Sequence, residues 1–174
     1  MNYRKKFIVF ILFISNLNAQ NKNETYSKIL KSDAVKMANA LLEKDYNMFC
    51  DYTYPQVVKM VGGKQKMMNT LKTATLEMEK EGYSFLKVTI GEPTEIFISK
   101  NELQATITQE LEMKVPEGKL VTISTLIAIS TTKGKKWHFI DASNKNISEL
   151  RKALPSLSKE LIIPIQSKPV FYKE

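Results

Sequence analysis

Residues 103–113, Leu-Gln-Ala-Thr-Ile-Thr-Gln-Glu-Leu-Glu-Met, decide the fold class of this chain. The odd positions are apolar except Gln109, and the even positions are all polar. Strict alternation predicts an antiparallel strand with one buried and one solvated face, because side chains alternate between the two faces of a sheet. A buried amide must find hydrogen-bond partners or cost about 1–3 kcal/mol. Gln109 therefore marks either a satisfied core residue or the floor of a pocket.

The amino terminus has the plan of a secretory signal peptide over residues 1–19. Three cations at positions 4–6 precede an apolar run at 7–14, and Ala19 precedes the expected cleavage site. The apolar run is much shorter than the roughly 20 residues that span a bilayer. We expect an exported protein, periplasmic or extracellular, with no membrane attachment after cleavage. An uncleaved membrane anchor is the alternative.

Composition narrows the classes of partner and cofactor. Cleavage after Ala19 would leave 155 of the 174 residues, the size of one domain, and would lower the formal net charge from +8 to +5. The lysines are scattered, whereas nucleic acid requires a concentrated basic face, so we expect no nucleic-acid partner. Cys50 is the only cysteine, so no intrachain disulfide can form. No metal-ligand cluster or cofactor motif is found, and we expect neither a metal nor a cofactor.

Helical patterns fill the first half of the chain. Residues 20–31 are polar and are expected to be flexible, and Ser32 or Asp33 is expected to cap the first helix. Apolar residues then recur at helical spacing, and the pattern restarts in two shorter pieces before Gly63. A long helix is expected over residues 64–81.

Strand patterns fill the second half, where we expect a bent antiparallel sheet of about four strands. The alternating segments are 83–90 with its continuation at 96–98, 103–113, 120–131 and 136–141. The domain is expected to span residues 32–142, followed by a C-terminal helix and apolar tail over 143–174. The fold class is therefore α+β, with the amino-terminal helices packed on a curved, cone-like sheet.

Turn lengths predict which residues of neighbouring strands face each other. A three-residue loop at 116–118 would place Gln109 opposite Thr125. A similar loop at 132–134 would place Thr125 opposite Asp141. The three polar side chains would then form one row across the apolar face, about 5 Å apart from strand to strand.

This polar row of Gln109, Thr125 and Asp141 allows two interpretations. In the first, Gln109 and Thr125 satisfy each other, and Asp141 lies near water at the end of the sheet. In the second, the three side chains line a small-molecule pocket together with Trp137 and Tyr52. A general base at Asp141 would also have to be buried, because burial makes a carboxylate more basic.

The order of elements, which ends in the strand Trp137-His138-Phe139-Ile140-Asp141, resembles the nuclear transport factor 2-like superfamily. The resemblance covers residues 33–142 and implies a cone-shaped fold in which a curved sheet wraps around a long helix. More narrowly, the chain resembles small exported bacterial proteins of unassigned function with this fold. The short hairpin that usually precedes the long helix is not visible, since residues 54–63 have a helical pattern.

Three functional hypotheses follow. The first is an exported binding or accessory module whose partly polar cavity accepts a small ligand. The second is an isomerase- or cyclase-like enzyme with Asp141 as general base, since members of the superfamily with that chemistry place Asp, His or Tyr inside the cone. The tyrosines that could act with it are Tyr46, Tyr52 and Tyr54. The third is an interaction module, including a homodimer, that uses the outer sheet face or the apolar tail.

Each hypothesis predicts a different interior. An enzyme should hold Asp141 buried in a closed apolar cavity of about a few hundred Å³. An interaction module should have a filled interior and an exposed apolar patch. The tail residues that would cover the cavity or contact a partner are Ile162, Ile163 and Ile165.

Overall fold

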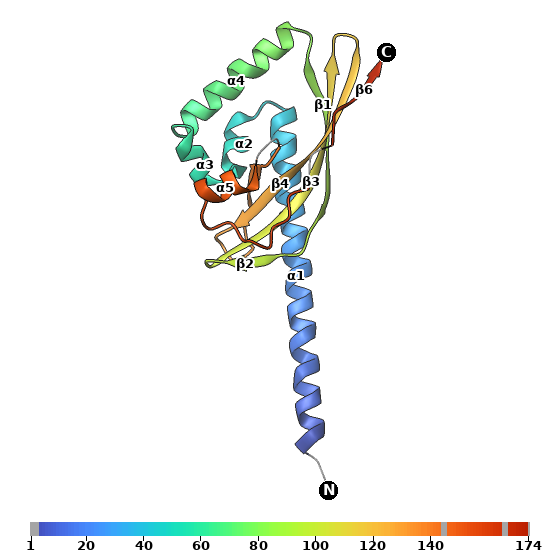
Figure 1. Cartoon of the computed structure of the whole chain (residues 1–174), viewed down its shortest axis with the longest axis vertical. Coiled ribbons are helices and arrows are strands. Elements are labelled where there is room, and N and C mark those ends of the chain that lie inside the picture. The colour runs from blue at the N-terminus through green and yellow to red at the C-terminus, as the bar shows by residue number, and fades with distance from the viewer. Residues whose placement is uncertain (1–3, 144–145, 165–166, 174) are drawn as a thin grey trace.

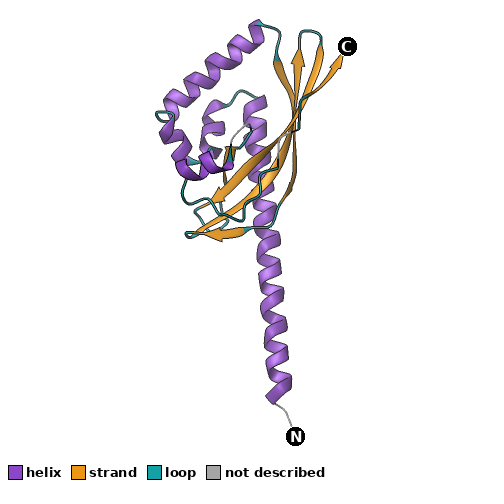
Figure 2. Ribbon diagram, in the orientation of Figure 1, coloured by secondary structure: helices purple, strands orange, loops and turns teal. Residues whose placement is uncertain are grey.

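The computed structural model describes residues 4–143, 146–164 and 167–173 and has an α+β fold (Figures 1 and 2). The helices are α1 (Arg4–Leu42), α2 (Tyr46–Tyr52), α3 (Pro55–Met60), α4 (Lys64–Lys80) and α5 (Ile147–Ala153). The strands are β1 (Ser84–Pro93), β2 (Phe97–Ser99), β3 (Glu102–Val115), β4 (Gly118–Ser130), β5 (His138–Asp141) and β6 (Val170–Lys173). No helix in the described part of the chain combines the length and apolar character needed to cross a membrane.

The strands form one antiparallel sheet around the long β3–β4 hairpin. The order is β1-β3-β4-β5, and β2 pairs with the start of β3. β5 pairs with the second half of β4, and β6 pairs with its first residues, 118–121. The described chain thus has six strands where about four were expected, because the continuation at 96–98 forms a separate strand, β2, and the tail returns to the sheet as β6 beside the β3–β4 turn (Figure 1).

The predicted register of the β3–β4 hairpin is wrong by one residue. The loop contains only Pro116 and Glu117, so Gln109 pairs with Ser124 and not with Thr125. The cause is Gly118, which belongs to β4 and pairs with Lys173 of β6 rather than completing the turn. A Cβ atom at Gly118 would lie 2.0 Å from the backbone oxygen of Tyr172, so glycine is needed there for the close approach of the two strands.

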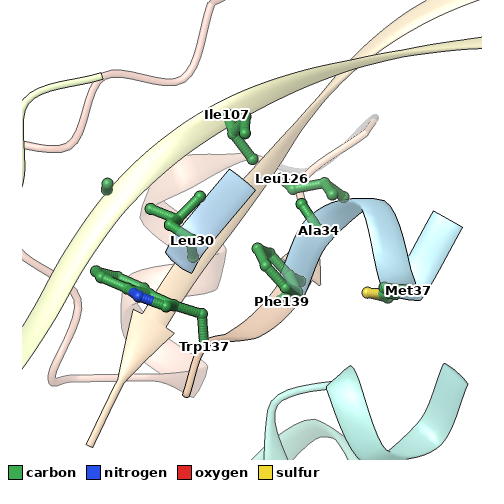
Figure 3. Close-up of a cluster of buried hydrophobic side chains, with 9 residues drawn as sticks. Leu30, Ala34, Met37, Ile107, Leu126, Trp137 and Phe139 are labelled. Carbon is green, nitrogen blue, oxygen red and sulfur yellow. The ribbon is translucent and has the colours of Figure 1, made fainter. Parts of the chain in front are cut away.

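One face of the sheet, which we call the α1 face, packs on α1 and forms an apolar core (Figure 3). Leu30 of α1 and Trp137 and Phe139 beside α1 are fully buried there. The residues of this core are Leu30, Ala34, Met37, Ala105, Ile107, Leu126, Ala128, Trp137 and Phe139.

The start of the first helix differs from the expectation. Residues 20–31 are not a flexible segment but part of α1, and Leu30 is completely buried. Asp33 does not cap a helix, because its buried carboxylate accepts the backbone N–H of Trp137 at 3.1 Å and pairs with Lys36 at 3.0 Å. A cap residue and a tertiary anchor look alike in sequence, since both are carboxylates near an apolar helical stripe.

The opposite face, which we call the tail face, is covered by the C-terminal segment, residues 146–164. Its core residues are Tyr54, Ile127, Ile129, Ile140, Ala142, Leu154, Leu157 and Leu161. Both faces are therefore buried along the first half of β3, where residues 104–107 are all buried. The strand predicted from alternation is confirmed, but its polar side is not solvated there.

The long helix after Gly63 is confirmed, yet it is not the helix that packs across the sheet. α1 lies along the sheet, whereas α4 packs on α2, α3 and the edge of β1 (Figure 1). Thr75 is the one residue of α4 that is buried, and Leu76 is 48% exposed. α4 therefore contributes little to the core of the described domain.

Candidate functional site

A largely apolar cavity of about 380 Å³ lies between the end of α1, α2, α3, the start of α4, β5 and α5. Three of its fourteen lining residues are polar, namely Thr53, Asp141 and Glu149. The apolar ones are Met37, Phe49, Val57, Met60, Val61, Met67, Phe139, Ile140, Leu150, Ala153 and Leu154. Figure 1 shows α2, α3 and α5 close to one another, with α4 continuing from α3.

The cavity has a buried floor and an exposed rim. Phe139 and Leu154 are at most 2% exposed, and Met37 is 7% exposed. Met60 and Val61, at the other extreme, are 61% and 42% exposed. A ligand could therefore enter from solvent and reach an apolar interior.

Local backbone signals bring these distant segments together. Pro55 begins α3, as its fixed φ angle favours the first turn of a helix. Gly62 and Gly63 have φ angles of 99° and 97°, which glycine adopts without strain, so the chain reverses and brings α3 and α4 to the same cavity. The backbone N–H of Tyr54 donates to the carbonyl of Phe139 at 3.0 Å, which ties the α2–α3 link to β5.

The polar lining residues differ in what they offer a ligand. Thr53 is buried, and its hydroxyl donates to the carbonyl of Phe49 at 3.0 Å, so this group is already satisfied. Asp141 is exposed, and its Oδ1 accepts from the backbone N–H of Ser143 at 2.8 Å and from the Ser143 hydroxyl. Glu149 is exposed in the first turn of α5, where the helix dipole favours a negative charge. Among the described residues that line the cavity, both charged side chains are therefore negative.

The predicted polar row is not formed. Gln109 faces Ser124 on the α1 face, whereas Thr125 pairs with Thr108 and Asp141 pairs with Leu126. The shift of one residue places Thr125 on the tail face, away from Gln109 and Asp141, because each step along a strand changes the face. The geometric basis of the predicted pocket is therefore wrong.

Only one of the five predicted ligand-binding residues lines the apolar cavity, and it is Asp141. Thr125 instead lines a smaller cavity of about 230 Å³ under the C-terminal segment. Trp137 is fully buried in the core of the α1 face. Tyr52 packs at the edge of that core, with the Lys136 ammonium 5.3 Å from its ring centroid. Gln109 lines neither cavity.

The surroundings of Asp141 differ from those that the enzyme hypothesis predicts for a general base. Asp141 is exposed, so it lacks the burial that the predicted general base requires. Tyr46, Tyr52 and Tyr54 do not line the cavity. The hydroxyl of Tyr54 donates to Glu102 at 3.0 Å, and burial together with that carboxylate raises the pKa of Tyr54.

The satisfied buried amide is Gln104, which the sequence pattern placed on the solvated side. Gln104 is 0% exposed. Its Nε2 donates to the carbonyl of Ser156 and to Glu102, both at 2.9 Å, and its Oε1 accepts the N–H of Ser158 at 2.8 Å. This side chain therefore anchors the C-terminal segment to β3.

The methionines of the cavity were also missed as site residues. Met37, Met60 and Met67 come from three helices, and no local pattern connects them. The nearest signal was the apolar pair Met60-Val61 directly before Gly62, but scattered exposed apolar residues are common on protein surfaces and do not by themselves mark a site.

Two other reactive side chains lie outside the cavity. Cys50 is buried, and burial raises the pKa of its thiol. His138 is half-buried with no hydrogen-bond partner for its Nδ1 atom among the described residues, and burial lowers its pKa. Within the described ranges, no three His, Cys, Asp or Glu side chains lie close enough together to hold a metal ion.

Comparison with known proteins does not identify a function for the cavity. No family model, curated protein or solved structure matches this chain. The resemblance to the nuclear transport factor 2-like superfamily stays a prediction.

Proposed function

We propose that this protein binds a small apolar ligand in the cavity between α2, α3, β5 and α5. The observation that carries the proposal is the cavity itself, because about 380 Å³ with an apolar lining lies within the range of small-molecule sites. The buried floor would remove an apolar ligand from water, which favours binding by about 25 cal/mol for each Å² of apolar surface.

The methionines of the cavity support a binding role. Met37, Met60 and Met67 have unbranched, polarisable side chains that adapt to ligands of different shapes. The lining residues include no histidine, cysteine or serine that could form a nucleophile–base pair. A binding module therefore fits this lining better than an enzyme.

The position of the core along α1 supports the proposal that the protein is exported. Tyr26 is the first described side chain that packs on the core of the α1 face, and residues 22–25 are exposed. Cleavage after Ala19 would leave in place the core contacts of all the side chains that the structure describes. A mature chain that begins at Gln20 would thus keep both the core and the cavity.

Binding can be tested by titrating the purified chain with 1-N-phenylnaphthylamine, whose fluorescence increases in apolar sites. We expect saturable binding at one site. Ala153→Phe fills the cavity from the exposed side of α5 and should weaken this binding about tenfold or more. Ser148→Phe adds the same side chain to the same helix outside the lining and should not weaken it.

Two results would contradict the proposal. One is the absence of saturable binding by the unmodified chain. The other is equal binding by Ala153→Phe and the unmodified chain, provided that circular dichroism shows the same helix content. The second result would place the probe somewhere other than the cavity.

A further inference from the structure

We infer that the cavity selects amphiphiles whose head group carries a positive charge. This inference rests on the proposed function and names the ligand class. Asp141 and Glu149 are the only charged residues among the fourteen that line the cavity, and both are carboxylates.

The two carboxylates belong to lining residues that are exposed, unlike those of the floor. Asp141 ends β5 and Glu149 begins α5, and both are exposed, whereas Phe139 and Leu154 on the floor are buried. An amphiphile with its apolar chain on the buried floor would direct its head group toward solvent, where both lining carboxylates are exposed. The Ser143 N–H and hydroxyl hold the Asp141 carboxylate in place.

The basic residues of α5 form no ion pair with Asp141 or Glu149 among the described residues. The Nη2 atom of Arg151 donates to the carbonyls of Ser158, Lys159 and Leu161 at 3.0, 3.1 and 3.2 Å. Its guanidinium is thus directed at the C-terminal segment, and neither Arg151 nor Lys152 lines the cavity.

The two carboxylates should rank ligands by the charge of their head groups. A cationic head group gains attraction from two carboxylates, a neutral one gains none, and a carboxylate head group is repelled. The rim is solvated, so each interaction is weak, and we expect a preference of about three- to tenfold for a cation over a neutral head group. The preference should shrink at high salt, because salt screens exposed charges.

The experiment compares octylammonium, 1-octanol and octanoate as competitors of 1-N-phenylnaphthylamine at neutral pH, in low and in high salt. These probes share one chain length and differ in head-group charge. We expect octylammonium to compete most strongly and octanoate least. The double variant Asp141→Asn/Glu149→Gln should bind octylammonium about as weakly as it binds octanol.

Both substitutions preserve the local structure, since Asp141→Asn still offers an oxygen to Ser143 and Glu149→Gln keeps the length of the side chain. Glu117→Gln, in the exposed β3–β4 turn, is the control for a general loss of negative charge and should keep the preference. If octanol competes but octylammonium is no stronger, or if the double variant keeps the preference, this inference is wrong while the apolar site stands. If the probe itself does not bind, the proposed function fails first.

Discussion

The two faces of the sheet are attached to the rest of the molecule by different kinds of interaction. The α1 face is held mainly by apolar burial, with Leu30, Trp137 and Phe139 fully inaccessible to solvent, and by the hydrogen bond between Asp33 and the Trp137 backbone. The tail face also buries leucines, but its covering segment is fixed to β3 by hydrogen bonds between the Gln104 side chain and the backbone of Ser156 and Ser158, while Arg151 ties together two parts of the segment itself. Burial over a large area is lost only when the domain unfolds, whereas a few polar anchors can be removed one at a time.

This difference matters for the cavity, because α5 belongs to the more weakly attached side. Leu150 and Ala153 of α5 form part of the cavity wall, and Arg151 of the same helix binds the segment that follows. The floor, in contrast, includes Phe139 and Met37 from the core of the α1 face. The α5 wall, together with Leu154 of the floor, can therefore loosen while Phe139 and Met37 remain fixed.

The largest effect is expected from Trp137→Ala on the α1 face. Removal of this fully buried side chain should lower the free energy of unfolding by about 3–5 kcal/mol, since it creates a large cavity in a packed core. Urea denaturation followed by far-ultraviolet circular dichroism measures the loss. Ile162→Ala, at a residue 77% exposed, is the control and should change stability by about 0.5 kcal/mol or less. Similar losses in both variants would contradict the comparison.

A smaller effect is expected from Gln104→Ala on the tail face. The substitution leaves the N–H of Ser158 and the carbonyl of Ser156 without this partner, which should cost about 1–3 kcal/mol. Hydrogen exchange should become faster at residues 156–158 while α1 keeps its protection. Gln109→Ala in the same strand changes a half-buried side chain that lines neither cavity and faces Ser124 across the sheet, so it should cost less. If Gln109→Ala is the more damaging change, Gln104 is not the main anchor of the C-terminal segment.

The smallest effect is the pH dependence from His138, whose strand position places it on the tail face. Burial, and to a lesser extent Lys136, lower its pKa below the usual 6.5, while Asp33 and Asp51 act in the opposite direction. The folded state therefore binds fewer protons than the unfolded state, and stability should fall as the pH drops below about 6.5 toward the lowered pKa. Above about 6.5 this contribution is constant. His138→Gln should remove the slope in thermal denaturation measured across this window, and an unchanged slope would assign it to other groups.

Local signals were sufficient to predict much of the fold. Pro55 begins α3 as expected, the Gly62-Gly63 pair separates α3 from α4, and β3 is the alternating strand. Each of these signals acts within a few residues, so it can be seen in sequence. The α+β class followed from them.

The features that were mispredicted depend on contacts between distant segments. Gln104 was placed in solvent because alternation does not show that residues 146–164 cover the polar side of β3. The register failed because Gly118 serves a contact with Lys173 of β6, near the other end of the chain. The cavity joins lining residues between Met37 and Leu154, and no single pattern spans that distance.

The bond between Asp33 and Trp137, 104 residues apart, has a consequence for the order in which the chain acquires its structure. Synthesis proceeds from the amino terminus, so the apolar stripe of α1 is made long before the β5 side chains that cover it. Contacts of such sequence separation form late and slow the folding of a domain. The nascent chain must therefore keep this helix from other apolar surfaces until nearly the whole domain has been synthesised.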